Sequence, residues 1–465
     1  MPLAMPVGAI NAVLFGLLVW LLPALKVTAA LIGVAGLLAV IRRPLRGLLL
    51  FGVLATFLPY ATVQIGIRTT VSEALLMLVW ASLMAHRVFA LYNRPLILLR
   101  TERWMLALML FSALPFVVGQ LTVNAEGNGP INWVRWLFNL SPLFLVPRLL
   151  ADEKSREQMT VALLLGTLAL LLLSIPVYLK NGNSTAIISI IGSLGYSNLD
   201  SLNEGLAGFS TRMSTPWTHP NISGGAMAML LPLAFCIAVT RRGLVRLLGI
   251  AVAVLALAGL LFTGSRGALV SLVLVMCWMA RKRVPFVGRM LMAGVFVGAL
   301  LLMFYPPLQD RLLGLFSSHD ASTAVRFDEY SHFPDAMKMF PLGIGFKVDP
   351  PVPGTGLWGI SNLWLNYIYK LGLPGMLLFV AVTVSWWKEA RLPRNIVILN
   401  RDTALWLGAR TGVMAALLSG FFDHYFSFTT VLIALFWLLL GLSLHEARRL
   451  RLKAQVTTLD SGERT

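Results

Sequence analysis

Four short segments of the sequence combine side chains that could hold or transfer a charged group. The first runs from Arg212 to Asn221, ends in Thr-His-Pro-Asn and leads into an apolar run. Asn221 is an expected helix N-cap, and the free N–H groups at a helix N-terminus bind anions. With Arg212 just upstream, the segment predicts an anion site. In the alternative interpretation, Arg212 is a solvated loop residue and His219 an ordinary loop histidine.

The second segment is Thr-Gly-Ser-Arg-Gly at residues 263–267, between two almost wholly apolar runs. The turn between such runs must be tight, so Arg266 is expected at the membrane boundary with Ser265 beside it. An ionisable side chain close to hydrocarbon is costly and is a functional candidate by default. The alternative is that Arg266 extends its guanidinium group to lipid phosphates.

The third segment, residues 325–346, combines an arginine, a histidine and carboxylates that could supply a general base. In the alternative, the carboxylates form a solvated helix face with ion pairs to Arg326 and Lys338. The charged and titratable residues concerned are Arg326, Asp328, Glu329, His332, Asp335 and Lys338.

The fourth segment, Ser-Asn-Leu-Trp-Leu-Asn-Tyr at residues 361–367, opens a long apolar run. Either Ser361 or Asn362 is expected to cap the helix there. Three polar groups in apolar surroundings also need partners, which we expect to be one another or Asp423. They are Asn366, Lys370 and Arg410.

These segments belong to a chain of membrane-protein composition. Of its 465 residues 57% are hydrophobic and 12% are charged, and the mean hydropathy is +0.79. A soluble protein is roughly a quarter charged, and this composition in a soluble protein would expose apolar patches and cause aggregation. The composition therefore excludes a globular cytosolic enzyme. It predicts an all-α polytopic membrane protein with about 12–14 transmembrane helices.

The net charge of +18 has a topological explanation. Basic loops alternate along the chain with poorly basic ones, and basic loops remain on the cytoplasmic side of a membrane. We therefore expect both termini in the cytoplasm and no nucleic-acid partner. Two long segments, 180–220 and 307–361, then lie on the non-cytoplasmic face.

The predicted organisation has six parts that follow from these spans and loops. They are N-terminal transmembrane helices at 1–180, a periplasmic loop with Arg212 at 181–220, central transmembrane helices with the Arg266 turn at 221–306, a large periplasmic loop with short helices at 307–361, C-terminal transmembrane helices at 362–445 and a cytoplasmic tail at 446–465.

The ordered set of motifs resembles the O-antigen ligase and polymerase superfamily, over residues 205–445 approximately. The resemblance is carried by Arg212 before Pro220-Asn221, by the Thr-Gly-Ser-Arg-Gly turn at 263–267, by Arg326 before Pro-Leu-Gly-Ile-Gly at 341–345, and by Asn362-x-x-Leu365 before Gly372-x-x-Gly375.

The resemblance implies a glycosyltransferase of the bacterial inner membrane that acts at the periplasmic face without a metal or another cofactor. Such enzymes move a glycan from undecaprenyl diphosphate to a hydroxyl group, of lipid A–core in ligases and of another lipid-linked repeat in polymerases. The family's essential arginines match Arg212 and Arg266, and two cations suit a doubly charged diphosphate leaving group. Arg326 would hold a second phosphate or a sugar. The predicted substrate-binding residues are His219, Asn221, Ser265, Ser361 and Asn362.

One departure from the family's pattern concerns the general base. The ligases carry a histidine immediately before the asparagine of the Asn-x-x-Leu element, and this sequence has Ser361 there. The departure favours a polymerase and leaves the base open. The candidates are His332, Glu329, Asp328, Asp335, His219 and His424.

The leading hypothesis is therefore a membrane polysaccharide polymerase, with a chain-length regulator as a further candidate partner. The alternatives are an O-antigen ligase and, from another class, a transporter of lipid-linked sugars. Transporters place charges at the bilayer midplane and often contain repeats. Here the notable arginines lie at the ends of spans, and only Lys370 and Arg410 support the transporter.

Overall fold

The computed structural model describes residues 24–65, 67–89, 97–124, 127–209, 211–304, 321–347, 352–357, 359–393, 399–428 and 431–462. Its helices are α2 (Ala24–Arg42), α3 (Pro44–Phe57), α4 (Val71–Val88), α5 (Arg100–Phe111), α6 (Ala113–Thr122), α7 (Gly129–Leu140), α8 (Pro142–Leu149), α9 (Glu153–Asn181), η1 (Thr185–Ile187), α10 (Ile188–Ser193), α11 (Leu199–Ala207), α12 (Pro220–Thr240), α13 (Gly243–Thr263), α14 (Arg266–Arg281), α15 (Val287–Phe304), α17 (Ala321–Met339), α18 (Leu363–Glu389), α19 (Ala404–Ser419) and α20 (Leu432–Gly462). The strands β1 (Thr62–Ile65) and β2 (Ile67–Thr70) pair antiparallel.

The chain is an all-α polytopic membrane protein, as its composition predicts. Among the described residues, six helical segments are long and apolar enough to cross a membrane: α4, α5 with α6, α9, α12, α13 and α18. Shorter apolar helices include α3 and α19. Residues 1–23 and 305–320 lie outside the described residues, so the predicted total of 12–14 transmembrane helices stays a prediction.

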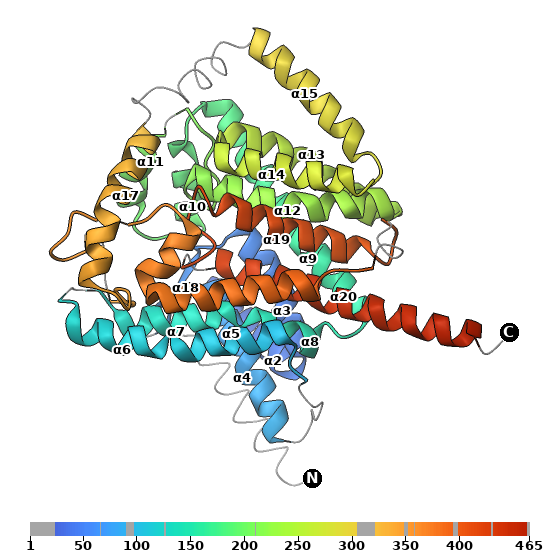
Figure 1. Ribbon diagram of the computed structural model, residues 1–465, viewed down its shortest axis with the longest axis horizontal. Coiled ribbons are helices and arrows are strands. Elements are labelled where there is room, and N and C mark those ends of the chain that lie inside the picture. The colour runs from blue at the N-terminus through green and yellow to red at the C-terminus, as the bar shows by residue number, and fades with distance from the viewer. Residues whose placement is uncertain are drawn as a thin grey trace.

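The central helices α12, α13, α14 and α19 lie side by side (Figure 1). Two-residue connections at 241–242 and 264–265 make the chain reverse between α12 and α13 and again before α14. The N-termini of α12 and α14 therefore lie at the same side of the bundle. We call this side the site face; it carries the helix ends at Asn181, Pro220, Thr263, Arg266, Leu363 and Ser419.

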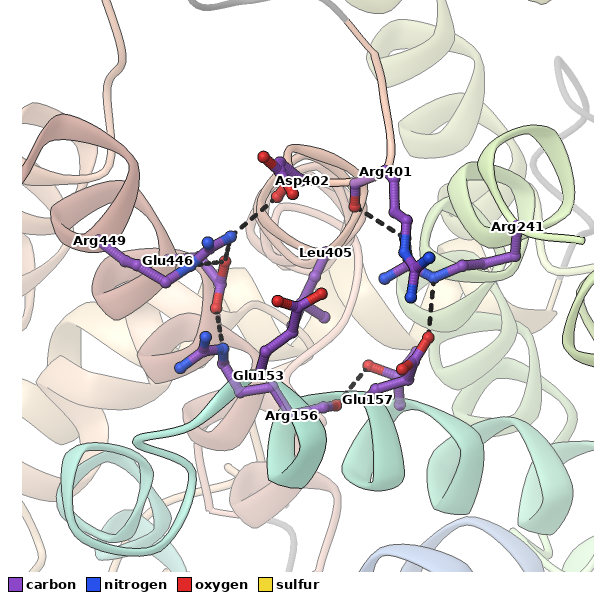
Figure 2. Close-up of a pocket in the computed structure, with 10 residues that line it drawn as sticks. Glu153, Arg156, Glu157, Arg241, Arg401, Asp402, Leu405, Glu446 and Arg449 are labelled. Carbon is purple, nitrogen blue, oxygen red and sulfur yellow. Dashed lines mark hydrogen bonds and ion pairs between the residues drawn. The ribbon is translucent and has the colours of Figure 1, made fainter. Parts of the chain in front are cut away.

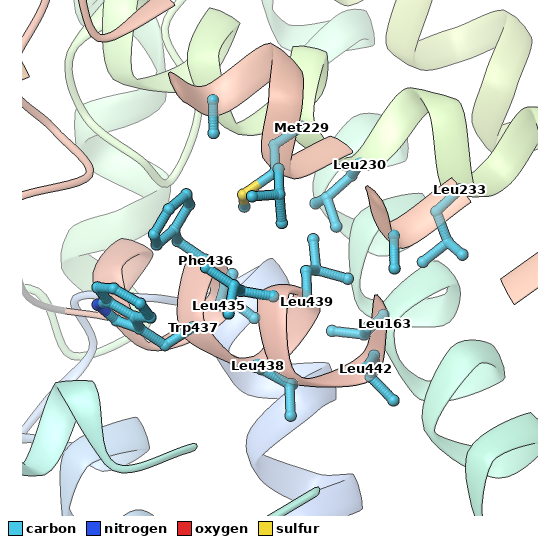
Figure 3. Close-up of a cluster of buried hydrophobic side chains, with 14 of the residues drawn as sticks. Leu163, Met229, Leu230, Leu233, Leu435, Phe436, Trp437, Leu438, Leu439 and Leu442 are labelled. Atoms are coloured by element: carbon cyan, nitrogen blue, oxygen red, sulfur yellow. The ribbon is translucent and has the colours of Figure 1, made fainter. Parts of the chain in front are cut away.

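The core surrounds the first half of α20. Described residues 431–444 of this segment are all buried, including Phe436 and Trp437. Leu163 of α9 and Met229, Leu230 and Leu233 of α12 surround α20 in Figure 3. A helix that is apolar on every side must lie inside a bundle. The first half of α20 is therefore the central helix against which the others pack.

Charged side chains join the helices at the opposite face. Figure 2 shows Glu446 between Arg156 and Arg449, and Glu157 beside Arg241. These residues come from α9, from α20 and from the loop after α12, and together with Arg401 and Asp402 they form the ionic clasp. The clasp encloses about 20 Å³, which is about the room that one water molecule needs. It therefore holds helices together and has no room for a substrate.

A larger hollow of about 530 Å³ lies between the end of α6 and the segment after α17. Its lining includes Val118, Met339 and Phe340, and none of its lining residues is ionisable. The lining of this hollow therefore offers no side chain for acid–base chemistry.

Candidate active site

Arg212 is held by two polar contacts at the site face. Its Nε donates to the carbonyl oxygen of Thr263 at 2.6 Å, and its Nη2 donates to Oδ1 of Asn221. The guanidinium carbon also lies 5.3 Å from the centre of the Phe209 ring. Arg212 therefore connects the segment before α12 to the turn before α14, and the solvated-loop alternative is wrong for this residue.

The N-terminus of α12 is capped by a different residue from the one predicted. His219 is the N-cap, because its Nδ1 accepts a hydrogen bond from the backbone N–H of Asn221 at 3.1 Å. Pro220 follows at the first helical position, which proline favours because it has no N–H to satisfy. Asn221 is already inside the helix, and this leaves its side-chain amide for Arg212.

The turn before α14 is as tight as the sequence predicts. Gly264 adopts a left-handed conformation with φ 58°, and Ser265 is the N-cap of α14. A Cβ atom on Gly224 of α12 would lie 2.5 Å from Cβ of Ser265. This close approach brings the first turn of α12 against the turn that carries Arg266. Arg266 is the first residue of α14 and is half-buried.

Arg326 pairs with a carboxylate that comes from the far end of the sequence. Its Nη2 lies 3.9 Å from Oδ2 of Asp423. The hydroxyl of Tyr425 hydrogen bonds with the Asp423 carboxylate and with the side chain of Asn221. A continuous chain of contacts therefore runs from Arg212 through Asn221, Tyr425 and Asp423 to Arg326.

The helix α17 also contacts the start of α18. Both oxygens of Glu329 accept from Ser361, at 2.7 Å from the backbone N and 3.0 Å from Oγ. Asn362 caps α18 by accepting hydrogen bonds from the backbone N–H groups of Trp364 and Leu365. Of the two predicted caps, Ser361 and Asn362, it is therefore Asn362 that caps the helix. Ser361, at the position of the ligases' histidine, therefore connects Glu329 of the large loop to the N-terminus of α18.

The loop between α19 and α20 lies at the centre of these elements. The carbonyl of Gly420 accepts from Leu363 N at 2.7 Å, and that of Phe421 from Asn362 Nδ2 at 3.2 Å. A Cβ atom on Gly267 of α14 would lie 2.6 Å from Cβ of Phe422. The loop that carries Asp423 therefore packs against the first turns of both α14 and α18.

The other predicted candidates on α17 lie away from this centre. His332 is 45% exposed and its Nδ1 lies 3.0 Å from the carbonyl of Asp328 in its own helix. Asp335 and Lys338 form an exposed ion pair at 2.8 Å. For Asp328 and Asp335, the solvated-face interpretation is confirmed; Arg326 pairs with Asp423 and not with these carboxylates.

The electrostatics of the site single out Asp423. Burial raises the pKa of its carboxyl to about 7, although Arg326, Tyr425 and Arg212 oppose the shift. Burial lowers the pKa of His219 to about 4, assisted by Arg212. Burial and Lys370 lower the pKa of His424 to about 4. Near neutral pH the two histidines are therefore neutral, and Asp423 is poised between its two protonation states.

The sequence pointed to Asp423 as a partner for polar groups inside the helices, and for Asn366 and Arg410 that expectation is wrong. Asn366 donates to Oγ of Ser427 at 2.7 Å. The guanidinium carbon of Arg410 lies within 6 Å of three tryptophan rings, 4.6 Å from the nearest, Trp387. The available signal was a charged residue between two apolar runs. This pattern indicates a candidate site residue, but it does not predict which arginine pairs with Asp423.

Comparison with known families supports the resemblance. The family model described as O-Antigen ligase matches residues 251–380, which include Arg266, Arg326 and Ser361. No curated protein matches the chain. The match covers the turn before α14, α17 and the start of α18, and the motif from Arg212 to Asn221 precedes it in the same order. Residues 251–380 are thus similar to the O-antigen ligase domain, and this supports the O-antigen ligase and polymerase superfamily for the chain.

Proposed function

We propose that the protein is a membrane polysaccharide polymerase that transfers a glycan from undecaprenyl diphosphate to a sugar hydroxyl of another lipid-linked repeat. One observation carries the proposal: Arg212, Arg266 and Arg326 come from three separate elements that meet around one loop at the site face. Arg266 begins α14 and Arg212 contacts the first turn of α12. Guanidinium groups beside helix N-termini suit a diphosphate, because fixed N–H donors and positive charge oppose its negative charge. The periplasmic location of this face belongs to the proposal.

The arginines would act on the leaving group. As the bond between the anomeric carbon and the phosphate oxygen breaks, negative charge grows on the diphosphate. Donors that are already in place stabilise that charge without reorganisation. Arg212 is fixed by Thr263 and Asn221, so its position does not depend on the substrate. His219, Asn221, Ser265, Ser361 and Asn362 remain proposed substrate-binding residues, and Ser265 and Asn362 are also helix caps.

The chemistry of this proposal needs no metal or cofactor, because the donor is already activated by its diphosphate. Partners are the lipid-linked donor, the glycan acceptor and the bilayer. A ligase is the second candidate function, since the matching family model is described as O-Antigen ligase. Ser361 in place of the ligases' histidine favours the polymerase.

The test uses the purified protein in detergent with one lipid-linked oligosaccharide repeat and no other acceptor. A polymerase gives a ladder of longer lipid-linked chains, and the Arg212→Ala and Arg266→Ala variants lose it. If no ladder forms but product appears when lipid A–core is added, the protein is a ligase. If neither acceptor gives product, the glycosyltransferase proposal fails and transport of lipid-linked sugars is tested next.

A further inference from the structure

The acceptor hydroxyl must lose a proton during the proposed transfer, and Ser361 occupies the position where the ligases carry a histidine. Ser361 cannot take that role, because a neutral serine hydroxyl is a very weak base; its Oγ donates to Glu329 at 3.0 Å. Glu329 is itself engaged at both oxygens by Ser361. The need for a general base rests on the proposed function. Among the described residues of the site, few side chains could accept the proton.

The histidines are poor proton acceptors in this fold. Nδ1 of His219 already accepts the backbone N–H of Asn221. The rings of His219 and His424 lie beside Tyr425, with ring centres 6.1 Å and 5.2 Å away. Both have a pKa of about 4, and a base that weak has little driving force to take a proton near neutral pH. His332 is exposed, and its Nδ1 lies 3.0 Å from a backbone carbonyl of its own helix.

Asp423 has the geometry that the other groups lack. It lies on the loop that packs against the first turn of α14, next to Phe422, which faces Gly267. Its carboxylate is held from one side by Arg326 and from another by the Tyr425 hydroxyl. Its side chain is 13% exposed, so it is largely buried yet open to a group that arrives at the site face.

We propose that Asp423 is the general base that deprotonates the acceptor hydroxyl, with Tyr425 and Arg326 as positioning residues. The acceptor oxygen forms a bond to the anomeric carbon of the donor as the bond from that carbon to the diphosphate oxygen breaks. Undecaprenyl diphosphate leaves with the electron pair of the broken bond. The proton of the acceptor hydroxyl passes to the Asp423 carboxylate, which afterwards releases it to water.

The surroundings of Asp423 support this role. The charged and titratable groups that act on it are Arg326 and Glu329 of α17, Arg212 of the segment before α12, and Tyr425 of its own loop. Burial outweighs the cations and raises the pKa of the carboxyl to about 7. A base is most effective when its pKa lies near the working pH, so burial makes this carboxylate a better base than an exposed one.

The experiment measures single-turnover transfer at saturating donor across pH 5–9. For the wild type, the rate should rise about tenfold per pH unit below pH 7, because only ionised Asp423 accepts the proton, and should level off above it. Asp423→Asn should lower the rate by about 10²–10⁴-fold and abolish this pH dependence, while competition by undecaprenyl diphosphate shows unchanged donor binding. Asp335→Asn, in an exposed ion pair of α17, is the control.

A second variant keeps the test decisive if Asp423→Asn does not fold. The hydrogen bond from Tyr425 lowers the pKa of Asp423, so Tyr425→Phe should move the midpoint of the wild-type profile to higher pH. The proposal is overturned if Asp423→Asn transfers glycan at nearly the wild-type rate, or if Tyr425→Phe leaves the midpoint unchanged. A wild-type protein that makes no product would instead refute the proposed function.

Discussion

At the scale of single residues, the site depends on cations whose geometry is fixed by other groups. Arg212 uses Nε and Nη2 for two different acceptors. A lysine ammonium is a compact point charge and cannot satisfy both acceptors in the same plane. The identity of the cation therefore matters as much as its charge.

This argument gives a prediction for Arg266. We expect Arg266→Lys to lose nearly as much transfer activity as Arg266→Ala, about 10²-fold or more, because a planar fork binds a diphosphate in two places. The measurement is the initial rate of ladder formation by the purified variants. Lys338→Ala, on the exposed side of α17, serves as the matched control and should leave the rate unchanged. Full activity of correctly inserted Arg266→Ala would remove Arg266 from the proposed mechanism.

At the scale of elements, the site is built from the first turns of three helices and one loop. The helices α12, α14 and α18 all begin at the site face, with His219, Ser265 and Asn362 as their N-caps. Glycines let these turns approach the loop between α19 and α20. The close contact of Gly267 with Phe422 matters most, because Asp423 is the next residue.

We therefore predict that Gly267→Ala lowers the transfer rate without unfolding the protein. The new Cβ would lie 2.6 Å from Cβ of Phe422, so the loop must move, and such overpacking costs about 1–3 kcal/mol. The matched control is Gly294→Ala in α15, where a Cβ meets no atom within 4 Å. Both variants are compared by transfer rate and by melting temperature in detergent. Equal rates for the two variants would show that the loop position does not matter.

At the scale of the whole molecule, the two faces are held together by different forces. The site face is organised by caps and by the chain of contacts from Arg212 to Arg326. The opposite face is organised by the ionic clasp, which joins α9 to α20 (Figure 2). The apolar first half of α20 links the two faces through the core.

The ionic clasp allows a prediction about stability. Glu446 is 1% exposed and contacts both Arg156 and Arg449, and Arg156 is itself buried. Glu446→Ala leaves the buried Arg156 without its carboxylate partner. Breaking a buried ion pair in this way lowers the free energy of unfolding by about 3–5 kcal/mol, so the melting temperature in detergent should fall clearly. Asp335→Asn removes a carboxylate from an exposed pair and should not change it. An unchanged melting temperature for Glu446→Ala would show that the clasp contributes little.

The sequence by itself determined the class of protein and the order of its motifs. The composition and the apolar runs suffice for an all-α membrane protein, because every backbone polar group in a bilayer must be satisfied within the chain. The tight turn at Gly264 also followed from local rules, and so did a helix cap at either Ser361 or Asn362. Local rules failed for the cap of α12, where Asn221 was expected. Histidine is an unusual N-cap residue, but the ring of His219 accepts the backbone N–H of Asn221.

Only the tertiary structure decided which side chains meet. Arg326 and Asp423 are far apart in the chain, and nothing in either local sequence links them. Their pairing depends on how α17 and the loop after α19 pack, and the pKa of Asp423 depends on the burial that this packing creates. A site whose contacts span distant segments is a property of helix packing, and for this reason the sequence indicated the arginines but not the carboxylate between them.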